Sequence, residues 1–212
     1  MKHMIVDIHT HQSVTSIYPS IRNLTFAEAG RRFASDIGGL FSVGIHPWHA
    51  DDFTPELFDK MSAWSTDKKF IALGECGLDK NSQVPMEIQL PVFEQQIALS
   101  EETGKPLIIH CVGCFNELFG LKKKLNPGQP WIIHGFRGKP QLAAQVLKAG
   151  CSISFGEHFN IESVRLTPTD RLFVETDESQ LPITEIYRSI ALIKNCLPEE
   201  LTAGEYFISR FK

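Results

Sequence analysis

Long hydrophobic runs are absent from this chain of 212 residues, and none reaches the ~18 apolar residues that a membrane helix needs. The first seven residues, Met1–Asp7, lack the apolar core of a signal peptide. An excess of basic residues is missing too, because 21 Lys and Arg face 25 Asp and Glu, for a net charge of −4. Bulk attraction to nucleic acid or to an anionic membrane is thereby excluded, although a bound metal ion can still supply positive charge where a phosphate sits.

Cysteine is scarce, with 5 residues, an odd number in a chain too long for a small disulfide scaffold. We therefore expect reduced thiols and a cytoplasmic location. Cys111 and Cys114 form a Cys-x-x-Cys motif, which we interpret as core thiols, with a redox or zinc pair as the alternative. The 42% hydrophobic content excludes disorder. No repeat or linker divides the sequence, so we predict a single domain over residues 1–212.

Short apolar runs alternate with amphipathic segments of helical length. Continuous runs bounded by Gly or Pro are typical of strands that are buried on both faces. Helical spacing follows several of them, as in Leu90–Glu101, Ile183–Ile193 and Pro198–Phe211. The predicted strands are Met4–Ile8, Leu40–Ile45, Phe70–Leu73, Pro106–Ile109, Trp131–Ile133, Cys151–Phe155 and Arg171–Val174.

This alternation predicts an α/β fold with a parallel sheet, either open and doubly wound or closed into a barrel. An eighth strand is expected around Ser20–Phe26, inside the poorly periodic stretch Gln12–Gly39. We predict a (β/α)8 barrel of the TIM type. It would be compact, since ~250 residues are typical of this fold, and distortion between residues 12 and 39 is left open.

Polar side chains with metal-binding chemistry stand at the ends of the predicted strands. In parallel α/β proteins the carboxyl ends of the strands face one mouth, where active sites are built. One histidine after a strand is usually structural, but so many together predict a metal site. The residues at these ends are His9, His11, His46, Glu75, His110, His134 and Asp177.

The number and type of ligands indicate two metal ions. His9 and His11 are two residues apart in an extended segment, so both imidazoles point to the same side. Six candidate ligands are too many for one tetrahedral ion and suit two ions ~3.5–4 Å apart. Imidazole-rich ligation without thiolate favours zinc, with manganese, magnesium, iron or nickel as alternatives. The candidate ligands are His9, His11, Glu75, His110, His134 and Asp177. The net positive centre that results favours an anionic substrate such as a phosphate ester.

The chain resembles the TatD-type metal-dependent hydrolases, TIM-barrel members of the amidohydrolase superfamily that are described as deoxyribonucleases. The resemblance rests on Val6–His11, Gly44–Pro47, Gly74–Asp79, Ile109-His110, His134–Gly138 and Glu175–Asp177. It implies that His9, His11, Glu75 and Asp177 hold one metal. Glu75, His110 and His134 would hold the other, with Glu75 as the bridge.

Two departures from the family concern substrate choice. The chain is shorter than most members, chiefly between His11 and Gly44 and after Asp177. The family tends to place a Ser-Arg-Asp-like stretch after the histidine of the fifth strand, whereas Cys111–Cys114 stand here and lack a basic residue that could hold a phosphate. Arg137 and Lys139 are alternatives for that contact, or are solvated surface residues.

We predict a metal-dependent hydrolase of phosphodiester bonds, a deoxyribonuclease acting on 3′ ends. DNA or another phosphodiester would be its substrate, with no membrane and no obligate protein partner. Asp177 is the predicted general base, because Glu75 and the histidines are committed to metals. His46, which matches the family's Gly-x-His-Pro, or protonated Asp177 would assist the leaving group. Glu75 would take part in catalysis as the bridging ligand.

Two other functions stay open at this point. One is hydrolysis of a small C–N or ester substrate, as in other amidohydrolases, many of which bridge their metals with a modified lysine where this chain has Glu75. The other is metal binding without turnover, against which Asp177 argues because an acid at the mouth has a role in proton transfer.

Overall fold

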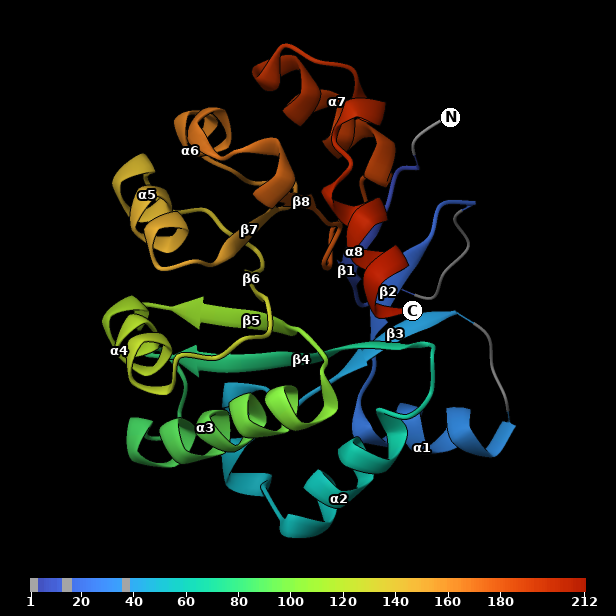
Figure 1. Cartoon of the computed structure of the whole chain (residues 1–212), viewed down its shortest axis with the longest axis vertical. Helices are drawn as coiled ribbons and strands as arrows, with labels where there is room; N and C mark the ends of the chain where they lie inside the picture. Colours follow the sequence, from blue (N-terminus) through green and yellow to red (C-terminus); the bar gives the residue numbers. More distant parts are fainter. Residues whose placement is uncertain (1–3, 13–16, 36–38) are drawn as a thin grey trace. The chain divides into compact units, whose positions relative to one another are not determined.

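The computed structural model describes residues 4–12, 17–35 and 39–212, which fall into two compact units. The first unit comprises residues 1–22 and 132–212, and the second comprises residues 23–131. Strands and helices alternate, and the order of the strands in the sheet follows the sequence from β1 to β8 (Figure 1). The single domain expected for residues 1–212 stays a prediction.

The first unit contains parallel strands with helices outside them. β1 (Asp7–Thr10) pairs with β2 (Ser20–Asn23), while β7 (Ser152–Phe155) pairs with both β6 (Trp131–Ile133) and β8 (Leu172–Val174). In Figure 1, α5, α6 and α7 lie on the outer side of β7 and β8. The helices are α5 (Pro140–Lys148), α6 (Ile161–Leu166), α7 (Ile183–Lys194) and α8 (Ala203–Phe211).

Helix α7 fixes the start of β1 as well as covering the strands. Its buried residues include Ile183, Ile186 and Ile190, a spacing that places them on one helix face. The hydroxyl of Tyr187, on the same face, donates to the carbonyl oxygen of Val6 at 2.9 Å and accepts from the N–H of Val6 at 3.2 Å. One side chain thus satisfies both backbone groups of the residue before β1.

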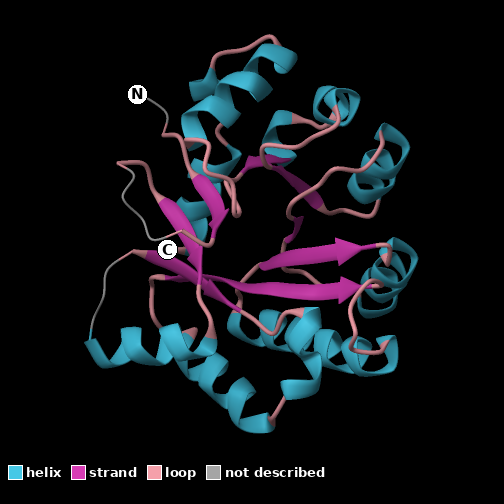
Figure 2. Ribbon diagram, turned by 180° about the vertical axis from the view of Figure 1, so that it is seen from behind, coloured by secondary structure: helices cyan, strands magenta, loops and turns pink. Residues whose placement is uncertain are grey.

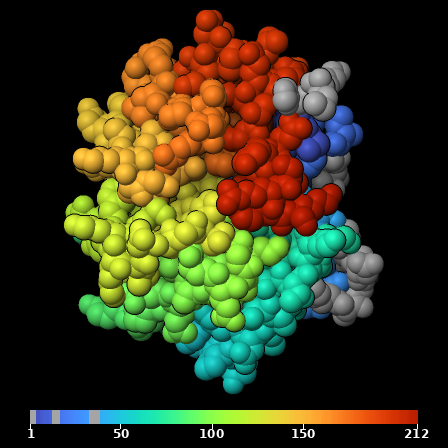
Figure 3. Space-filling view, viewed as in Figure 1, coloured from blue at the N-terminus to red at the C-terminus, as the bar shows by residue number. Residues whose placement is uncertain are grey.

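The second unit is built around β3 (Leu40–Val43), β4 (Phe70–Asp79) and β5 (Leu107–Val112), which pair in parallel in that order. Figure 2 shows β4 and β5 running side by side. A 3-10 helix, η1 (Pro47–Asp52), follows β3. In the space-filling view, cyan and green segments of this unit lie at the visible surface (Figure 3). The α-helices of this unit are α1 (Phe26–Ser35), α2 (Pro55–Trp64), α3 (Met86–Thr103) and α4 (Phe115–Leu125).

Strand β4 is longer than the predicted run Phe70–Leu73, and all ten of its residues are buried. It continues through Glu75 to Asp79 because two glycines let β5 approach closely. A Cβ placed on Gly77, which has φ +131°, would lie 2.1 Å from the carbonyl oxygen of His110. The hydrophobic pattern ends too early because the second half of the strand carries polar and small residues.

The ends of other strands and helices differ by a few residues from the predicted ones. The strand predicted over Met4–Ile8 is β1, Asp7–Thr10, so His9 lies within the strand and not after it. His110 likewise lies within β5, which continues to Val112. The helix predicted over Pro198–Phe211 is divided into a 3-10 turn, Pro198–Glu200, and α8.

The poorly periodic stretch Gln12–Gly39 holds the expected eighth strand and one helix that we did not predict. The strand expected around Ser20–Phe26 is confirmed as β2. Helix α1 begins with a capping box, in which Thr25 Oγ1 accepts from the N–H of Glu28 and Glu28 Oε2 accepts from the N–H of Thr25. Residues 13–16 and 36–38 of the stretch lie outside the described residues. Within the described residues, no helix has the length and apolar character that a membrane crossing requires.

Candidate metal centre

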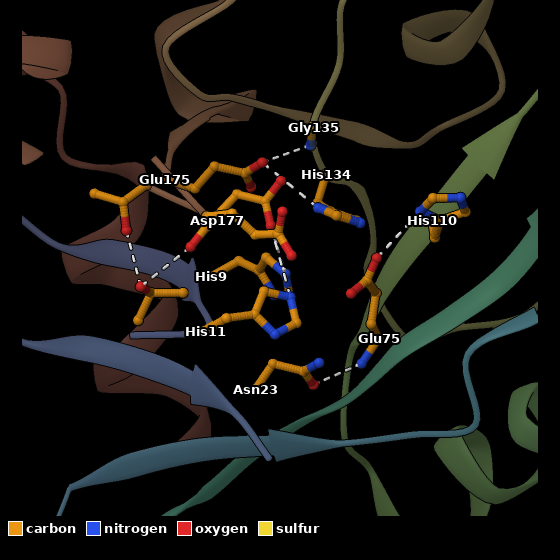
Figure 4. Close-up of polar contacts among 12 residues, drawn as sticks. His9, His11, Asn23, Glu75, His110, His134, Gly135, Glu175 and Asp177 are labelled. Atoms are coloured by element: carbon orange, nitrogen blue, oxygen red, sulfur yellow. Dashed lines mark hydrogen bonds and ion pairs between the residues drawn. The ribbon is translucent and has the colours of Figure 1, made fainter. Parts of the chain in front are cut away.

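His9, His11 and Asp177 come together in the first unit. The Nε2 atoms of His9 and His11 lie 3.7 and 3.6 Å from Asp177 Oδ1 (Figure 4). Backbone bonds hold this arrangement, since the N–H of Asp177 donates to His9 O at 3.0 Å and the N–H of His11 donates to Asp177 O at 3.1 Å. Asp177 has a left-handed φ of 53°, which turns the chain at this point. Two imidazoles and a carboxylate therefore converge as predicted from the sequence.

A buried carboxylate beneath this cluster ties β1 to the segment that carries Asp177. Asp7 accepts from Thr176 twice, at 3.0 Å from the N–H and at 2.6 Å from Oγ1, and from the N–H of His9 at 3.4 Å. Burial raises the pKa of Asp7 to about 7, although the hydrogen bonds from Thr176 act in the opposite direction. We assigned Asp7 no role from the sequence, yet it positions the backbone on both sides of the cluster.

His134 and Glu175 form a second pair in the same unit. His134 Nδ1 lies 3.5 Å from Glu175 Oε1, which also accepts from the N–H of Gly135 at 2.5 Å (Figure 4). Glu175 is fully buried, which by itself raises its pKa, but the hydrogen bond and charge of His134 and the charge of His9 outweigh burial and lower it. The ring centroid of His134 lies 4.4 Å from that of His9. Sequence analysis predicted His134 but gave Glu175 no role.

In the second unit, His110 lies between two carboxylates. Its Nδ1 is 3.1 Å from Glu75 Oε1, and its Nε2 is 3.0 Å from Asp79 Oδ2. Metal-binding histidines commonly donate their other ring N–H to a carboxylate, which fixes the tautomer. Asp79 fits this role, and Nδ1 is then left facing Glu75. Burial raises the pKa of Asp79, but hydrogen bonds from the N–H of Asn81, from Trp48 and from His110 outweigh it and lower the pKa.

His46 lies beside Glu75 with its tautomer fixed by the backbone. Its Nδ1 accepts from the N–H of Trp48 at 3.2 Å, so the ring proton is on Nε2. Nε2 lies 3.4 Å from Glu75 Oε1, and the ring centroid lies 4.5 Å from that of His110. A protonated Nε2 can donate a hydrogen bond. This state suits the predicted role near the leaving group better than metal ligation.

Amide side chains that we did not single out hold these residues in place. Asn23 Oδ1 accepts from the N–H of Glu75 at 2.8 Å (Figure 4). Two buried glutamines of α3 bind the ends of neighbouring strands: Gln96 bonds both backbone groups of Ile45, and Gln89 bonds both backbone groups of Asp79. The seven-residue spacing of Gln89 and Gln96 is typical of one helix face. It does not indicate which backbone groups the two side chains bind.

The donor sets fit divalent transition metals. Within the first unit, the ligand atoms of His9, His11 and Asp177, and those of His134, Glu175 and Asp177, lie within 4.8 Å of one another. In the second unit the same holds for His46, Glu75 and His110. Imidazole and carboxylate groups are ligands that zinc, manganese and iron accept. Cys111 and Cys114 belong to none of these sets among the described residues.

A pocket of about 190 Å³ lies beside Asp177 in the first unit. Arg137 and His158, both exposed, contribute the basic side chains of its lining, which also includes Gly135 and Gly156. Its acidic lining residues are Glu157, Glu175, Asp177 and Glu178. A cation on Asp177 would offset part of this negative charge.

Curated proteins similar to this chain include a metal-dependent hydrolase and an exonuclease. The chain is 34% identical over 145 residues to an uncharacterized metal-dependent hydrolase, YabD, of Bacillus subtilis. It is 28% identical over 177 residues to the 3′-5′ ssDNA/RNA exonuclease TatD of Klebsiella pneumoniae. These matches cover 64% and 75% of the chain, and 57% and 65% of the relatives. The chain thus spans less than two thirds of the length of the curated relatives that it matches.

The fold has a solved counterpart in YJJV, a TatD homolog from Escherichia coli. The two superpose with a TM-score of 0.81 at 18% identity, covering 98% of this chain and 97% of that one. This likeness concerns the fold and confirms the predicted (β/α)8 barrel. A family model described as TatD related DNase matches residues 6–197. This match includes the strands that carry every predicted ligand, and the chain belongs to the TatD related DNase family.

Proposed function

We propose that the protein is a metal-dependent nuclease that hydrolyses phosphodiester bonds of DNA, attacking from the 3′ end. The observation that carries the proposal is the gathering of imidazoles and carboxylates into sets suited to divalent metals. Membership of the TatD related DNase family supports it. The relative from Klebsiella pneumoniae is named as an exonuclease of single-stranded DNA and RNA, which favours single strands here as well. A cytoplasmic location and the lack of an obligate protein partner stay predictions.

The metal-binding residues proposed are those predicted from the sequence. His9, His11 and Asp177 would hold one divalent cation, with zinc as the first choice. Glu75, His110 and His134 would supply ligands to a second cation, and the bridging role of Glu75 is a prediction of the family resemblance. Divalent cations lower the pKa of bound water and neutralise charge on a phosphate.

The chain itself supplies the groups that move protons. Asp177 Oδ1 is the oxygen close to His9 and His11, so Oδ2 can accept a proton from the attacking water. His46 carries its ring proton on Nε2 and can donate a hydrogen bond from it to the departing alkoxide. The buried carboxylates Asp7 and Asp79 bond to the neighbours of these groups and hold them in position.

The experiment that tests this function compares substrates of different bond types. Metal-loaded protein is incubated with single-stranded DNA, duplex DNA, bis-p-nitrophenyl phosphate and a set of small amides and esters. We expect phosphodiester cleavage that exceeds amide cleavage and stops when a chelator is added. Faster cleavage of an amide or carboxylic ester would favour the amidohydrolase alternative. Metal binding without hydrolysis of any substrate would favour a binding protein.

Arg137 is proposed to contact a substrate phosphate from the pocket beside Asp177, in place of the basic residue missing after His110. Arg137→Ala should raise KM for an oligonucleotide about 10-fold, because a hydrogen bond to a charged group contributes roughly 1.5 kcal/mol or more. The value of kcat should change little. Steady-state kinetics of both proteins measure the effect.

Lys139→Ala is the matched control, because Lys139 is also exposed and does not belong to the described pocket lining. Equal rises in KM for both variants would mean that general surface charge, and not the pocket, attracts the substrate.

A further inference from the structure

Trp48 is a large exposed aromatic residue directly after the candidate acid His46. It lies in η1 of the second unit and exposes 57% of its surface. Its ring meets that of His46 edge to face, with centroids 4.9 Å apart and an interplanar angle of 85°. The centroid of His110 lies 6.3 Å away. The exposed indole of Trp48 is therefore in direct contact with His46 and close to His110, two of the residues proposed to act on the phosphodiester.

The indole is exposed but fixed. Its Nε1–H donates to Asp79 Oδ2 at 2.7 Å, and its backbone N–H donates to His46 Nδ1 at 3.2 Å. Asp79 is only 3% exposed, so the acceptor is itself held in the protein. Pro47 precedes Trp48 and restricts the backbone of the turn. A side chain anchored in this way loses little conformational freedom when a flat ligand stacks on it.

We propose that Trp48 is the stacking platform for an unpaired nucleobase next to the bond that is cleaved. The inference rests on the proposed nuclease function and adds to it a source of affinity and of preference for single strands. Bases in a duplex already stack on their neighbours, whereas an unpaired base can place its π face on an aromatic side chain. The chain has a net charge of −4, so stacking supplies binding that phosphate contacts alone provide weakly.

A simpler role for Trp48 would be to hold Asp79 through its N–H. Two substitutions separate the roles. Trp48→Phe keeps an aromatic face and loses the N–H, whereas Trp48→Leu loses both. Stacking predicts that the phenylalanine variant keeps most of the affinity for a base and that the leucine variant does not. A hydrogen-bonding role predicts equal loss in both variants.

The experiment measures binding to two strands of equal length and charge, an oligothymidylate and a fully abasic strand. Both carry phosphorothioate linkages, which hydrolyse slowly, and dissociation constants come from fluorescence anisotropy with metal-loaded protein. The wild-type protein should bind the thymidylate strand about 5- to 150-fold more tightly than the abasic strand, the usual contribution from stacking of one base. In Trp48→Leu this ratio should fall close to one.

Tyr206→Leu is the control, because Tyr206 is 69% exposed on α8 and distant in sequence from every predicted ligand. Its discrimination between the two strands should equal that of the wild-type protein. An unchanged ratio in Trp48→Leu, with circular dichroism showing a folded protein, would overturn the proposal. Equal loss in Trp48→Phe and Trp48→Leu would overturn it too, in favour of the hydrogen-bonding role.

Cleavage of the same strands with ordinary phosphodiester linkages distinguishes failure of this inference from failure of the proposed function. Cleavage of both strands at equal kcat/KM would overturn the stacking role and leave the nuclease function intact. Absence of cleavage with either strand would contradict the nuclease function. In that case the binding ratio still decides whether Trp48 stacks on bases.

Discussion

Asp177→Asn protein is expected to hydrolyse its phosphodiester substrate about 10²–10⁴-fold more slowly than the wild-type protein, the usual contribution of a general base. Asparagine keeps the shape of the side chain and one oxygen near His9 and His11, but it cannot accept a proton. The backbone hydrogen bonds from Asp177 to β1 do not involve the side chain, so the position of residue 177 is retained. Metal content should fall much less than kcat.

The measurements are kcat under saturating metal and elemental analysis of the same samples. Asp170→Asn is the control, since Asp170 is an exposed acid in the 3-10 turn Thr169–Arg171 and should leave both quantities unchanged. If the Asp177→Asn variant keeps more than about a tenth of the wild-type kcat with its metal bound, its loss lies below the usual range for a base. Asp177 would then be a ligand only.

Glu75→Ala protein is expected to lose most of its bound metal and, with it, all chelator-sensitive activity. Glu75 is 7% exposed, and its Oε1 lies within 3.4 Å of His46 and within 3.1 Å of His110. Removing outer partners of a metal site already costs roughly 10–100-fold in affinity, so loss of a ligand should cost at least as much. Metal per chain is measured after dialysis against metal-free buffer.

Glu87→Ala is the control for Glu75→Ala, because Glu87 is an exposed glutamate in the first turn of α3. It should retain the wild-type metal content. Equal metal content in Glu75→Ala and wild-type protein would exclude Glu75 as a ligand, bridging or otherwise. A loss of a single ion per chain would support ligation by Glu75 without the bridge.

Hydrophobic pattern located seven strands of the fold, with errors at their ends. The three-residue strand β6 coincides with its predicted run, and β2 was expected from the requirement for an eighth strand. The pattern failed where a strand is not apolar, as in the second half of β4, where Glu75 and Gly77 interrupt the run. It also missed α1, although Thr25 and Glu28 carry the spacing of a capping box.

The supporting residues were harder to predict because their partners are remote in sequence. Asn23 bonds to Glu75 across 52 residues, and Asp7 bonds to Thr176 across 169. Neither residue type nor spacing indicates such a contact, because Asn and Asp are also common in turns, where they bond to nearby backbone groups. The predicted ligands stand at or just after the ends of apolar runs, and so does Glu175, which directly follows the run Arg171–Val174. Its bond to the N–H of Gly135 and its place beside His134 are evident only in the folded chain.

The peptide of Asp177 is bonded to the segment that carries His9 and His11: its N–H donates to His9 O, and its carbonyl oxygen accepts from the N–H of His11. The backbone positions of these three residues are thus set by bonds within the polypeptide, which lowers the entropy lost when a cation binds. Small zinc domains behave differently, because their folding depends on the metal. For this chain we expect one divalent ion to exchange for another while the protein stays folded, so that the metal in use follows availability and ligand chemistry.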